Sequence, residues 1–314
     1  MAQHPAIQPH EIIPVSQSRW NRYQFFSKMA LPWLLMLPIL ILHAIVVALP
    51  AISSIYFSLT DWSGINQPVF IGLENYRKIF TEDPQVGSAF AHNIIWLGFF
   101  LTIPFILALF AASLLAQIKR GGMIYRTLLF IPFILPSVVT TAIWRNLLSP
   151  RLGIPSQLAL ITGNDIFDVA LLGRSSTVLL TIAFIDNWHW WGFLMILFLT
   201  AMQSIPVVLY DAAKIDGANR WQEFRYVTLP GIRPVILFML MMSAIWAFLA
   251  FDYVWILTQG GPAGASDLMA TVLYRNAFAR FEAGYAAAQG LLLSALAGVI
   301  VLFFLYLRRR GWEI

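Results

Sequence analysis

The chain has 314 residues, of which 59% are hydrophobic and only 11% are charged. Ordinary globular domains carry about 25% charged residues, so this composition argues against a water-soluble fold. The absence of cysteine excludes disulfide bonds, thiolate metal sites and a cysteine nucleophile. The net charge of +5 is no sign of nucleic-acid binding, because in a membrane protein the distribution of Lys and Arg among the loops is what matters.

Six apolar runs are long enough to cross the hydrocarbon core of a membrane as helices, which takes about 20 residues each. The runs are continuously apolar and lack the alternation of barrel strands, so we expect an all-α membrane protein with six transmembrane helices. The predicted spans are Ala30–Phe57, Asn93–Ile118, Thr127–Leu148, Thr177–Met202, Val235–Leu257 and Ala286–Leu307.

Lys and Arg concentrate in the tails and in every second connection. Thirteen of the 20 basic residues lie there: Arg19, Arg22, Lys28, Lys119, Arg120, Arg126, Lys214, Arg220, Arg225, Arg233, Arg308, Arg309 and Arg310. The positive-inside rule therefore predicts that both termini are cytoplasmic. We expect a cytoplasmic tail over 1–29, a six-helix membrane domain over 30–309 and a second tail over 310–314. Aromatic residues of the first tail either anchor the first span or form a short interfacial segment.

Several sequence motifs are missing. There is no GxxxxGK[ST] phosphate loop and no HExxH pair, and the five histidines form no metal-ligand set. No ladder of arginines or relay of carboxylates runs along a span. We therefore expect neither an enzyme nor a bound metal or cofactor in this chain. A self-sufficient secondary carrier or channel is the second class considered, and it would need ion-coupling residues or a selectivity filter.

The connection Ser204–Pro234 is long for a simple link, and its sequence predicts two short helices. Ser204 is a good N-cap, with Pro206 tolerated in the first turn. Gly217 stands where a left-handed residue would end the first helix. Pro230 is expected to stop the second helix.

The sequence of this connection also predicts where the second helix starts and which face of the first helix is narrow. Asn219, followed three residues later by Gln222, is a capping-box-like start. Ala212 and Ala213 give the first helix a narrow face beside Asp211. Small side chains allow close approach, as a helix needs when it docks in the groove of a partner.

The same connection resembles the EAA loop of ABC importer permeases, E-A-A-x3-G-x9-I-x-L-P. The matching residues are Asp211-Ala212-Ala213, Gly217 and Val227-Thr228-Leu229-Pro230. Asp211 replaces the usual Glu, which shortens its reach, and Val227 replaces the usual Ile. The alternative is an ordinary interfacial helical hairpin.

Other segments resemble carbohydrate ABC permeases of the MalF/UgpA-like half, so that the likeness covers nearly the whole chain from residue 30 onward. They are Ile71-Gly72-Leu73-Glu74-Asn75-Tyr76, the stretch from Phe251-Asp252 to Gly260-Gly261-Pro262, Tyr274-Arg275-Asn276-Ala277-Phe278 and Gly284-Tyr285-Ala286-Ala287-Ala288.

This resemblance implies a permease subunit of an ATP-driven importer, with a six-helix MalF/MetI-like fold. The implied partners are a second, MalG-like permease, two copies of a cytoplasmic ATPase that bind ATP and Mg, and an extracytoplasmic binding protein. A sugar or oligosaccharide is the implied substrate, and a glycerol-3-phosphate-type ligand or another polar solute is the alternative. The implied ATPase-coupling residues are Asp211, Ala212, Ala213, Gly217, Leu229 and Pro230.

The fourth predicted span holds the most polar membrane segment. A charged side chain at the centre of a span costs roughly 2.5–3.5 kcal/mol on insertion scales, so Asp186 should face protein or water. At helical spacing Asp186 shares a face with His189 and Trp190, and a carboxylate beside an indole suits a sugar. The predicted substrate pathway is Asp186, Asn187, Trp190, Ser243 and Trp246, with Tyr253 on the same broad face as Ser243.

These substrate assignments have a structural alternative. Asp186 would instead pair with another helix, and the tryptophans would only fill the bundle. Related permeases carry a pair of amides where this chain has Asp186-Asn187, which leaves the identity of the sugar open. Asp252 falls on a different face from Ser243, so we expect it to hold the turn at Gly260-Gly261-Pro262.

Overall fold

The computed structural model describes residues 31–118 and 120–310. The predicted cytoplasmic tail over 1–29 and nearly all of the tail over 310–314 lie outside these residues. The chain divides into two units, residues 1–54 and residues 55–314. The two units are treated separately below.

The described part of the first unit is a single apolar helix. It contains the π-helix η1 (Ala44–Ala48) and the start of α2 (Leu49–Phe57), and none of its side chains is buried. At the π-turn Leu49 N–H donates to Ala44 O, five residues back. Pro50 follows directly, so the wider turn leaves space for the proline ring and the helix continues. A helix that is apolar on every side is typical of a membrane span.

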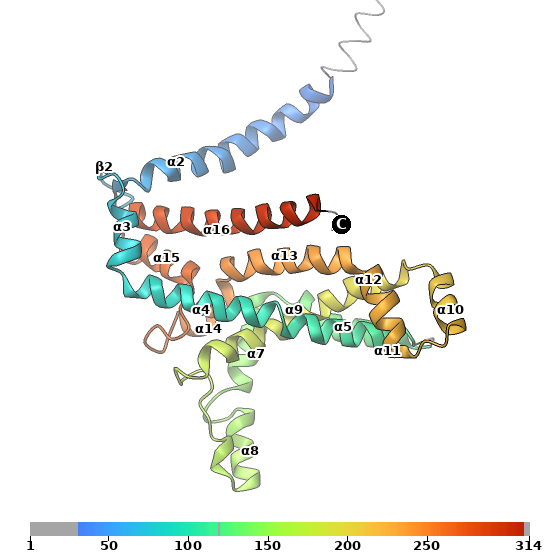
Figure 1. The fold of residues 1–314 in the computed structure, drawn as a ribbon. Helices are drawn as coiled ribbons and strands as arrows, with labels where there is room; N and C mark the ends of the chain where they lie inside the picture. Colours follow the sequence, from blue (N-terminus) through green and yellow to red (C-terminus); the bar gives the residue numbers. More distant parts are fainter. Residues whose placement is uncertain (1–30, 119, 311–314) are drawn as a thin grey trace, which may run out of the picture. The chain divides into compact units, whose positions relative to one another are not determined.

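The second unit is almost entirely helical (Figure 1). Its one strand pair among the described residues joins β1 (Thr60–Asp61) to β2 (Val69–Phe70), with Thr60 opposite Phe70. The helical elements are α3 (Glu74–Thr81), α4 (Pro84–Phe100), α5 (Ile103–Leu115), α6 (Gly122–Ile134), α7 (Ser137–Leu147), α8 (Ile154–Thr162), η2 (Asp165–Phe167), α9 (Val178–Gln203), α10 (Val207–Ile215), α11 (Arg220–Glu223), η3 (Phe224–Thr228), α12 (Leu229–Gly231), α13 (Arg233–Leu249), α14 (Asp252–Thr258), α15 (Met269–Phe278) and α16 (Ala283–Arg309).

The membrane-spanning elements agree with the predicted fold class. Over the described ranges five helices are long and apolar enough to cross a membrane: Leu31–Phe57, Pro84–Leu115, Val178–Gln203, Arg233–Thr258 and Ala283–Leu307. The pair α6 and α7 is the sixth candidate, and it is bent by 97°. The chain is thus an all-α membrane protein with up to six spans.

Two spans differ most clearly from the sequence prediction. The second span begins at Pro84 instead of Asn93, because Asp83 caps α4 by accepting hydrogen bonds from Gln85 N and Val86 N at 2.9 and 3.4 Å. The polar residues after Pro84 hid this first part from a search for apolar runs. The third span is not straight, because Leu135 and Pro136 are extended between α6 and α7.

Helix α9 is the centre of the packing. Ile182, Leu194 and Phe198 are among its fully buried side chains, and α5 and α6 pack along it. Gly192 permits the contact with α6, since a Cβ there would lie 2.1 Å from Leu129 O. A second apolar cluster, which includes Phe248, Met269 and Val272, joins α4, α13, α15 and α16.

Candidate functional site

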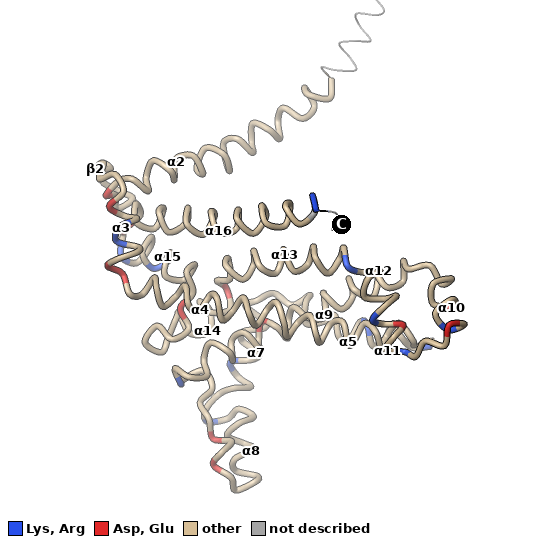
Figure 2. The backbone as a smooth tube through the Cα atoms, in the orientation of Figure 1, with Lys and Arg blue, Asp and Glu red and all other residues tan. Residues whose placement is uncertain are grey.

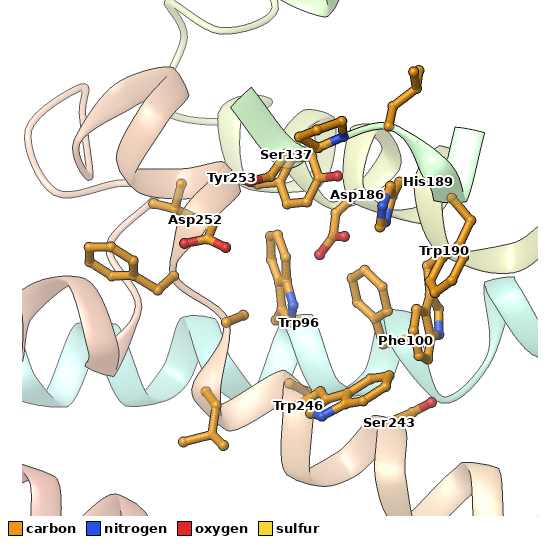
Figure 3. Close-up of a pocket in the computed structure, with 18 of the residues that line it drawn as sticks. Trp96, Phe100, Ser137, Asp186, His189, Trp190, Ser243, Trp246, Asp252 and Tyr253 are labelled. Atoms are coloured by element: carbon orange, nitrogen blue, oxygen red, sulfur yellow. The ribbon is translucent and has the colours of Figure 1, made fainter. Parts of the chain in front are cut away.

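A cavity of about 590 Å³ lies among α4, α9 and the two interrupted helices of the second unit (Figure 3). One wall is the junction of α6 and α7, and another is the junction of α13 and α14. Interrupted helices expose backbone and polar side chains in the membrane, and this is tolerated only where they line a cavity or are buried in protein. We call this space the central cavity.

The α13–α14 junction has no proline, and a distant side chain supports it. The last carbonyls of a helix have no partner within the helix, and Ala247 O belongs to this last turn of α13. Asn93 of α4, which is fully buried, donates from Nδ2 to Ala247 O at 2.8 Å. Its Oδ1 accepts from Met269 N at 2.8 Å, at the start of α15. One amide therefore joins three helices behind the cavity wall.

Most of the predicted substrate residues line the central cavity. Asp186, Trp190, Ser243 and Trp246 do so. Asn187 does not line it: its side chain is buried elsewhere on α9. The indoles of Trp190 and Trp246 meet edge to face, with ring centroids 4.4 Å apart.

Tyr253 and His189 also line the central cavity, as their positions on the predicted faces allow. The His189 ring lies 5.2 Å from that of Phe133 and 5.9 Å from that of Tyr253, measured between centroids. From its position on α9, His189 therefore contacts both the end of α6 and the start of α14.

The prediction for Asp252 was wrong in its location. The break after Leu249 turns the first residue of α14 toward the central cavity, so Asp252 faces the same space as Asp186 (Figure 3). The prediction assumed one continuous helix, which would have put Asp252 on another face. Trp96, Phe100 and Ser137 also line the cavity and were missed, because each lies in a run that looks like ordinary apolar or turn sequence.

Asp267 has the role that was expected of Asp252. It accepts from Arg275 Nη2 at 2.6 Å and from Nη1 at 3.0 Å, and Arg275 Nη2 also donates to Gln259 O at 2.9 Å. Gly260 lies against this pair, since a Cβ there would come 1.9 Å from Asp267 Oδ1. The hydrogen bonds from Arg275 to Asp267 raise the pKa of that guanidinium above its usual value.

The loop 204–234 forms a second candidate site at one end of the unit, where α10 protrudes (Figure 1). The expected end of its first helix is confirmed. Gly217 has a φ of +78°, Gly217 N–H donates to Lys214 O, and Ala218 N–H donates to Ala213 O. This pair of bonds is the Schellman motif, which requires a left-handed residue at the glycine.

The start of the second helix is confirmed as well. Gln222 N donates to Asn219 Oδ1 at 3.0 Å, and Asn219 N donates to Gln222 Oε1 at 2.8 Å. This reciprocal pair is a capping box. The loop is also tied to the connection between α5 and α6, because the Arg220 guanidinium donates to Gln117 Oε1.

Two predictions within the loop were wrong. Ser204 ends α9 instead of capping α10: its Oγ donates back to Ala201 O, and Pro206 is the residue before α10. Pro230 does not stop the second helix. The π-helix η3 precedes it, with Leu229 N–H bonded to Phe224 O, so the helix passes the proline and continues to Gly231. Pro50 in the first unit is passed in the same way.

The loop exposes several apolar side chains, while its two ends are anchored. Ile205 and Ile232 are buried in the main core. Tyr210 Oη and Thr228 Oγ1 lie 3.0 Å apart and join α10 to η3. By contrast Val208 and Ile215 of α10 are 74% and 86% exposed.

Interrupted membrane helices around a cavity lined by polar and aromatic side chains are typical of membrane transport proteins. The profile of the family described as "Binding-protein-dependent transport system inner membrane component" matches residues 104–310. The chain belongs to this family of inner membrane components, the permeases of ABC transporters, and is therefore a transport subunit and not a catalytic one.

Similar proteins agree with this membership. A probable ABC transporter permease of Pyrococcus horikoshii is 32% identical over 89% of this chain and 96% of its own length. The diacetylchitobiose uptake system permease NgcF of Streptomyces coelicolor is 31% identical, over 87% of this chain and 80% of its own. The sn-glycerol-3-phosphate transport system permease UgpA of Yersinia pestis is 30% identical, over 91% of this chain and 96% of its own length.

A solved structure has the same fold. It is a bacterial ABC transporter involved in the import of the acidic polysaccharide alginate, with a TM-score of 0.80. The identity is 24%, and the match covers 92% of this chain and 99% of that chain.

Proposed function

We propose that this chain forms half of the translocation pathway of an ATP-driven sugar importer, with the central cavity as its substrate site and the loop 204–234 as its contact with the ATPase. The observation that carries the proposal is the combination, in one compact unit, of a membrane cavity lined by polar and aromatic side chains with a protruding loop that exposes apolar side chains. The complete transporter also contains a second membrane subunit, two ATPase copies and an extracytoplasmic binding protein.

The loop is suited to transmit force. Its protruding helix α10 has no buried residue, and exposed apolar groups such as Val208 and Ile215 are typical of a protein-binding surface. Both ends of the loop are fixed in the core by Ile205 and Ile232. A partner that grips α10 and moves would therefore shift α9 and α13, which carry the cavity residues. Asp211, Ala212, Ala213 and Gly217 form the docking element, with Leu229 and Pro230 at its exit.

The mechanism follows from this connection. The ATPase subunits close on ATP, and the docked α10 moves with them. The pull on α9 and α13 then changes which side of the membrane the central cavity opens to. The substrate is released when the cavity opens to the cytoplasm.

A sugar is the substrate class that the cavity favours. Aromatic rings such as Trp190 and Trp246 can cover the apolar face of a sugar, and Asp186 and Ser243 can bind its hydroxyls. The relative that takes up diacetylchitobiose supports this choice. The relative that transports sn-glycerol-3-phosphate supports the alternative. No Lys or Arg is among the described residues that line the cavity, so its charge disfavours a phosphate.

The proposed orientation places both termini and the loop 204–234 in the cytoplasm. Figure 2 shows Lys and Arg at the end of the second unit that carries α10, α11 and the end of α16. The positive-inside rule favours the cytoplasm for this end.

The experiment is a pull-down of tagged protein from native membranes in mild detergent, comparing wild type with Gly217→Asp. We expect the wild type to recover an ATPase and a second membrane subunit, and the variant to recover much less ATPase. Asp is one of the few residues that tolerate a left-handed backbone, so the added charge and bulk at the docking surface dominate the effect.

The matched control is Gly163→Asp. Gly163 also ends a short exposed helix with a positive φ, of +63°, and a Cβ there would likewise meet no atom within 4 Å. This variant should recover as much ATPase as the wild type. Wild-type protein that emerges without an ATPase, under conditions that keep a known importer intact, would sink the proposal.

A further inference from the structure

The turn between α15 and α16 holds a bulky residue in a backbone conformation that favours glycine. Phe281 has a φ of +56°. A left-handed backbone is uncommon for residues with a Cβ, and for a bulky side chain it is a genuine outlier. Phe281 is also 56% exposed, so burial of the ring does not offset this strain. Strained residues that persist at a protein surface are typical of functional positions.

The backbone on both sides of Phe281 is fixed by hydrogen bonds. Arg280 N–H donates to Arg275 O at 3.0 Å, and Glu282 N–H donates to Asn276 O at 2.9 Å. These bonds tie the turn to the last part of α15. The exposed ring is therefore held in one place, and a partner that binds it loses little conformational freedom.

Charged and polar side chains surround the exposed ring. Glu282 Oε2 lies 3.3 Å from Lys78 Nζ of α3, and Arg280 Nη2 donates to Gln85 Oε1 of α4 at 3.0 Å. An aromatic anchor with a polar rim is the usual anatomy of a protein–protein interface. The hydrocarbon of a membrane would leave these charges without water, so lipid is a poor partner for this turn.

The turn lies at the end of the second unit that is opposite to the loop 204–234. Figure 1 shows α15 and the start of α16 at one end and α10 at the other. The last membrane span begins at Ala283, directly after the turn. In the proposed orientation the turn is therefore at the extracytoplasmic surface of the membrane.

A row of aromatic rings connects this end of the unit to the central cavity. Its members are Phe278, Tyr274, Trp255 and Phe251, and neighbouring ring centroids are 4.7, 4.7 and 5.6 Å apart. Phe278 is the last residue of α15 and is 65% exposed, while Phe251 lines the central cavity. A protein that binds this turn would therefore contact side chains that are packed continuously onto the cavity wall.

We propose that the α15–α16 turn is a docking surface for the extracytoplasmic binding protein, with Phe281 as its anchor and Arg280 and Glu282 at its rim. This inference rests on the proposed function and names the contact for one partner of the transporter. The family of this chain is described as binding-protein-dependent, so a binding protein has to reach the extracytoplasmic end of the complex.

The first test is photo-cross-linking in cells that make the whole transporter, with p-benzoylphenylalanine in place of Phe281. We expect a cross-link to an extracytoplasmic solute-binding protein, identified by mass spectrometry. The matched control carries the same probe in place of Phe303, which is 61% exposed and lies toward the other end of α16. The control should give no such product.

The second test measures ATP hydrolysis by the reconstituted complex as the cross-linked binding protein, now purified, is added. Phe281→Gly should raise the concentration for half-maximal stimulation about tenfold, as expected for loss of an aromatic anchor. Its thermal unfolding temperature should not fall, because glycine adopts a positive φ without strain. Phe281→Tyr should keep normal stimulation. Ala263→Gly is the control for the backbone, since Ala263 is also exposed, with a φ of +50°, and its stimulation should match wild type.

The outcomes are distinct. Cross-links only to lipid or to the second membrane subunit, or no cross-link at all, overturn the docking proposal. Phe281→Gly that stays within about twofold of wild type overturns it too. A lower unfolding temperature of Phe281→Gly would make Phe281 a packing residue and also overturn it. The importer proposal fails separately, and only if the wild-type complex contains no ATPase.

Discussion

The two interrupted helices around the central cavity are broken in different ways. Between α6 and α7, Pro136 follows an extended Leu135, so the break is set by neighbouring residues. Between α13 and α14 there is no proline, and the Asn93 amide, 154 residues from Ala247, binds the freed carbonyl. The first break therefore persists by itself, while the second depends on contacts between helices.

This difference has a consequence for transport. A break that depends on contacts between helices can respond when those helices move. The α13–α14 junction carries Trp246 on one side and Asp252 on the other, and α13 begins directly after the loop 204–234. We therefore expect this junction, and not the proline-bearing one, to change shape when the ATPase acts.

Asn93→Leu should have the largest effect. It leaves Ala247 O and Met269 N–H buried without partners, which costs about 1–3 kcal/mol for each group. Thermal unfolding in detergent should shift strongly downward, and transport should be lost. The control is Asn146→Leu, because Asn146 Nδ2 bonds only to Ala142 O of its own helix. Equal stability of the two variants would show that Asn93 does not hold the break.

Arg275→Gln should have the next largest effect, since it removes the pair that fixes the end of α14. We expect a loss of about 2 kcal/mol, below the roughly 3–5 kcal/mol of a fully buried pair, because Arg275 keeps some contact with water. The pKa of Arg275 is raised, so its contribution is complete below the pKa of the unfolded chain and is lost only as pH rises through the folded value. The stability difference between wild type and variant should thus stay constant from neutral to mildly alkaline pH. A difference that shrinks over that range would contradict this assignment.

Trp190→Ala tests the cavity between the two breaks. It removes the indole that packs against Trp246 in the lining of the cavity. Uptake should fall about tenfold, a loss of about 1.4 kcal/mol of binding energy, while recovery of the ATPase stays unchanged. Trp33→Ala is the control, because Trp33 is an exposed side chain of the first unit and lies outside both the central cavity and the loop 204–234. Uptake that stays normal in Trp190→Ala would remove this residue from the pathway.

Pro136→Ala should have the smallest effect. Pro136 has φ −58° and ψ 145°, a conformation that Ala also adopts, so mainly the entropy of the unfolded chain changes, by about 0.4–1 kcal/mol. Thermal unfolding should move by a few degrees at most. A loss as large as that of Asn93→Leu would mean that the two breaks are held in the same way.

Sequence reasoning succeeded where the decisive contacts are local. Gly217 and the pair Asn219 and Gln222 bond within a few residues, so the turn and the restart of the loop could be predicted. The spans could be predicted as well, because a continuous apolar run is a local property of the sequence. Asp186, Trp190, Ser243 and Trp246 line one cavity, and this grouping could be anticipated because a charged or polar group in a span has to face protein or water.

It failed where distant or unusual backbone contacts decide the structure. The π-turn before Pro230 replaces the expected helix end, and nothing in the local propensities signals it. The location of Asp252 depends on the break that Asn93 supports from another helix. Asp267, and not Asp252, holds the turn at Gly260 through Arg275. The spacing of these residues in the sequence does not reveal that the fold brings them together.

The central claim is that the loop 204–234 serves coupling and the central cavity serves the substrate. The most direct measurement is ATP hydrolysis and sugar uptake by one reconstituted complex, in wild type, Gly217→Asp and Trp190→Ala. We expect Gly217→Asp to lose both activities together, and Trp190→Ala to keep basal ATP hydrolysis while uptake falls about tenfold. Normal uptake by Gly217→Asp, or loss of basal hydrolysis in Trp190→Ala, would contradict the account.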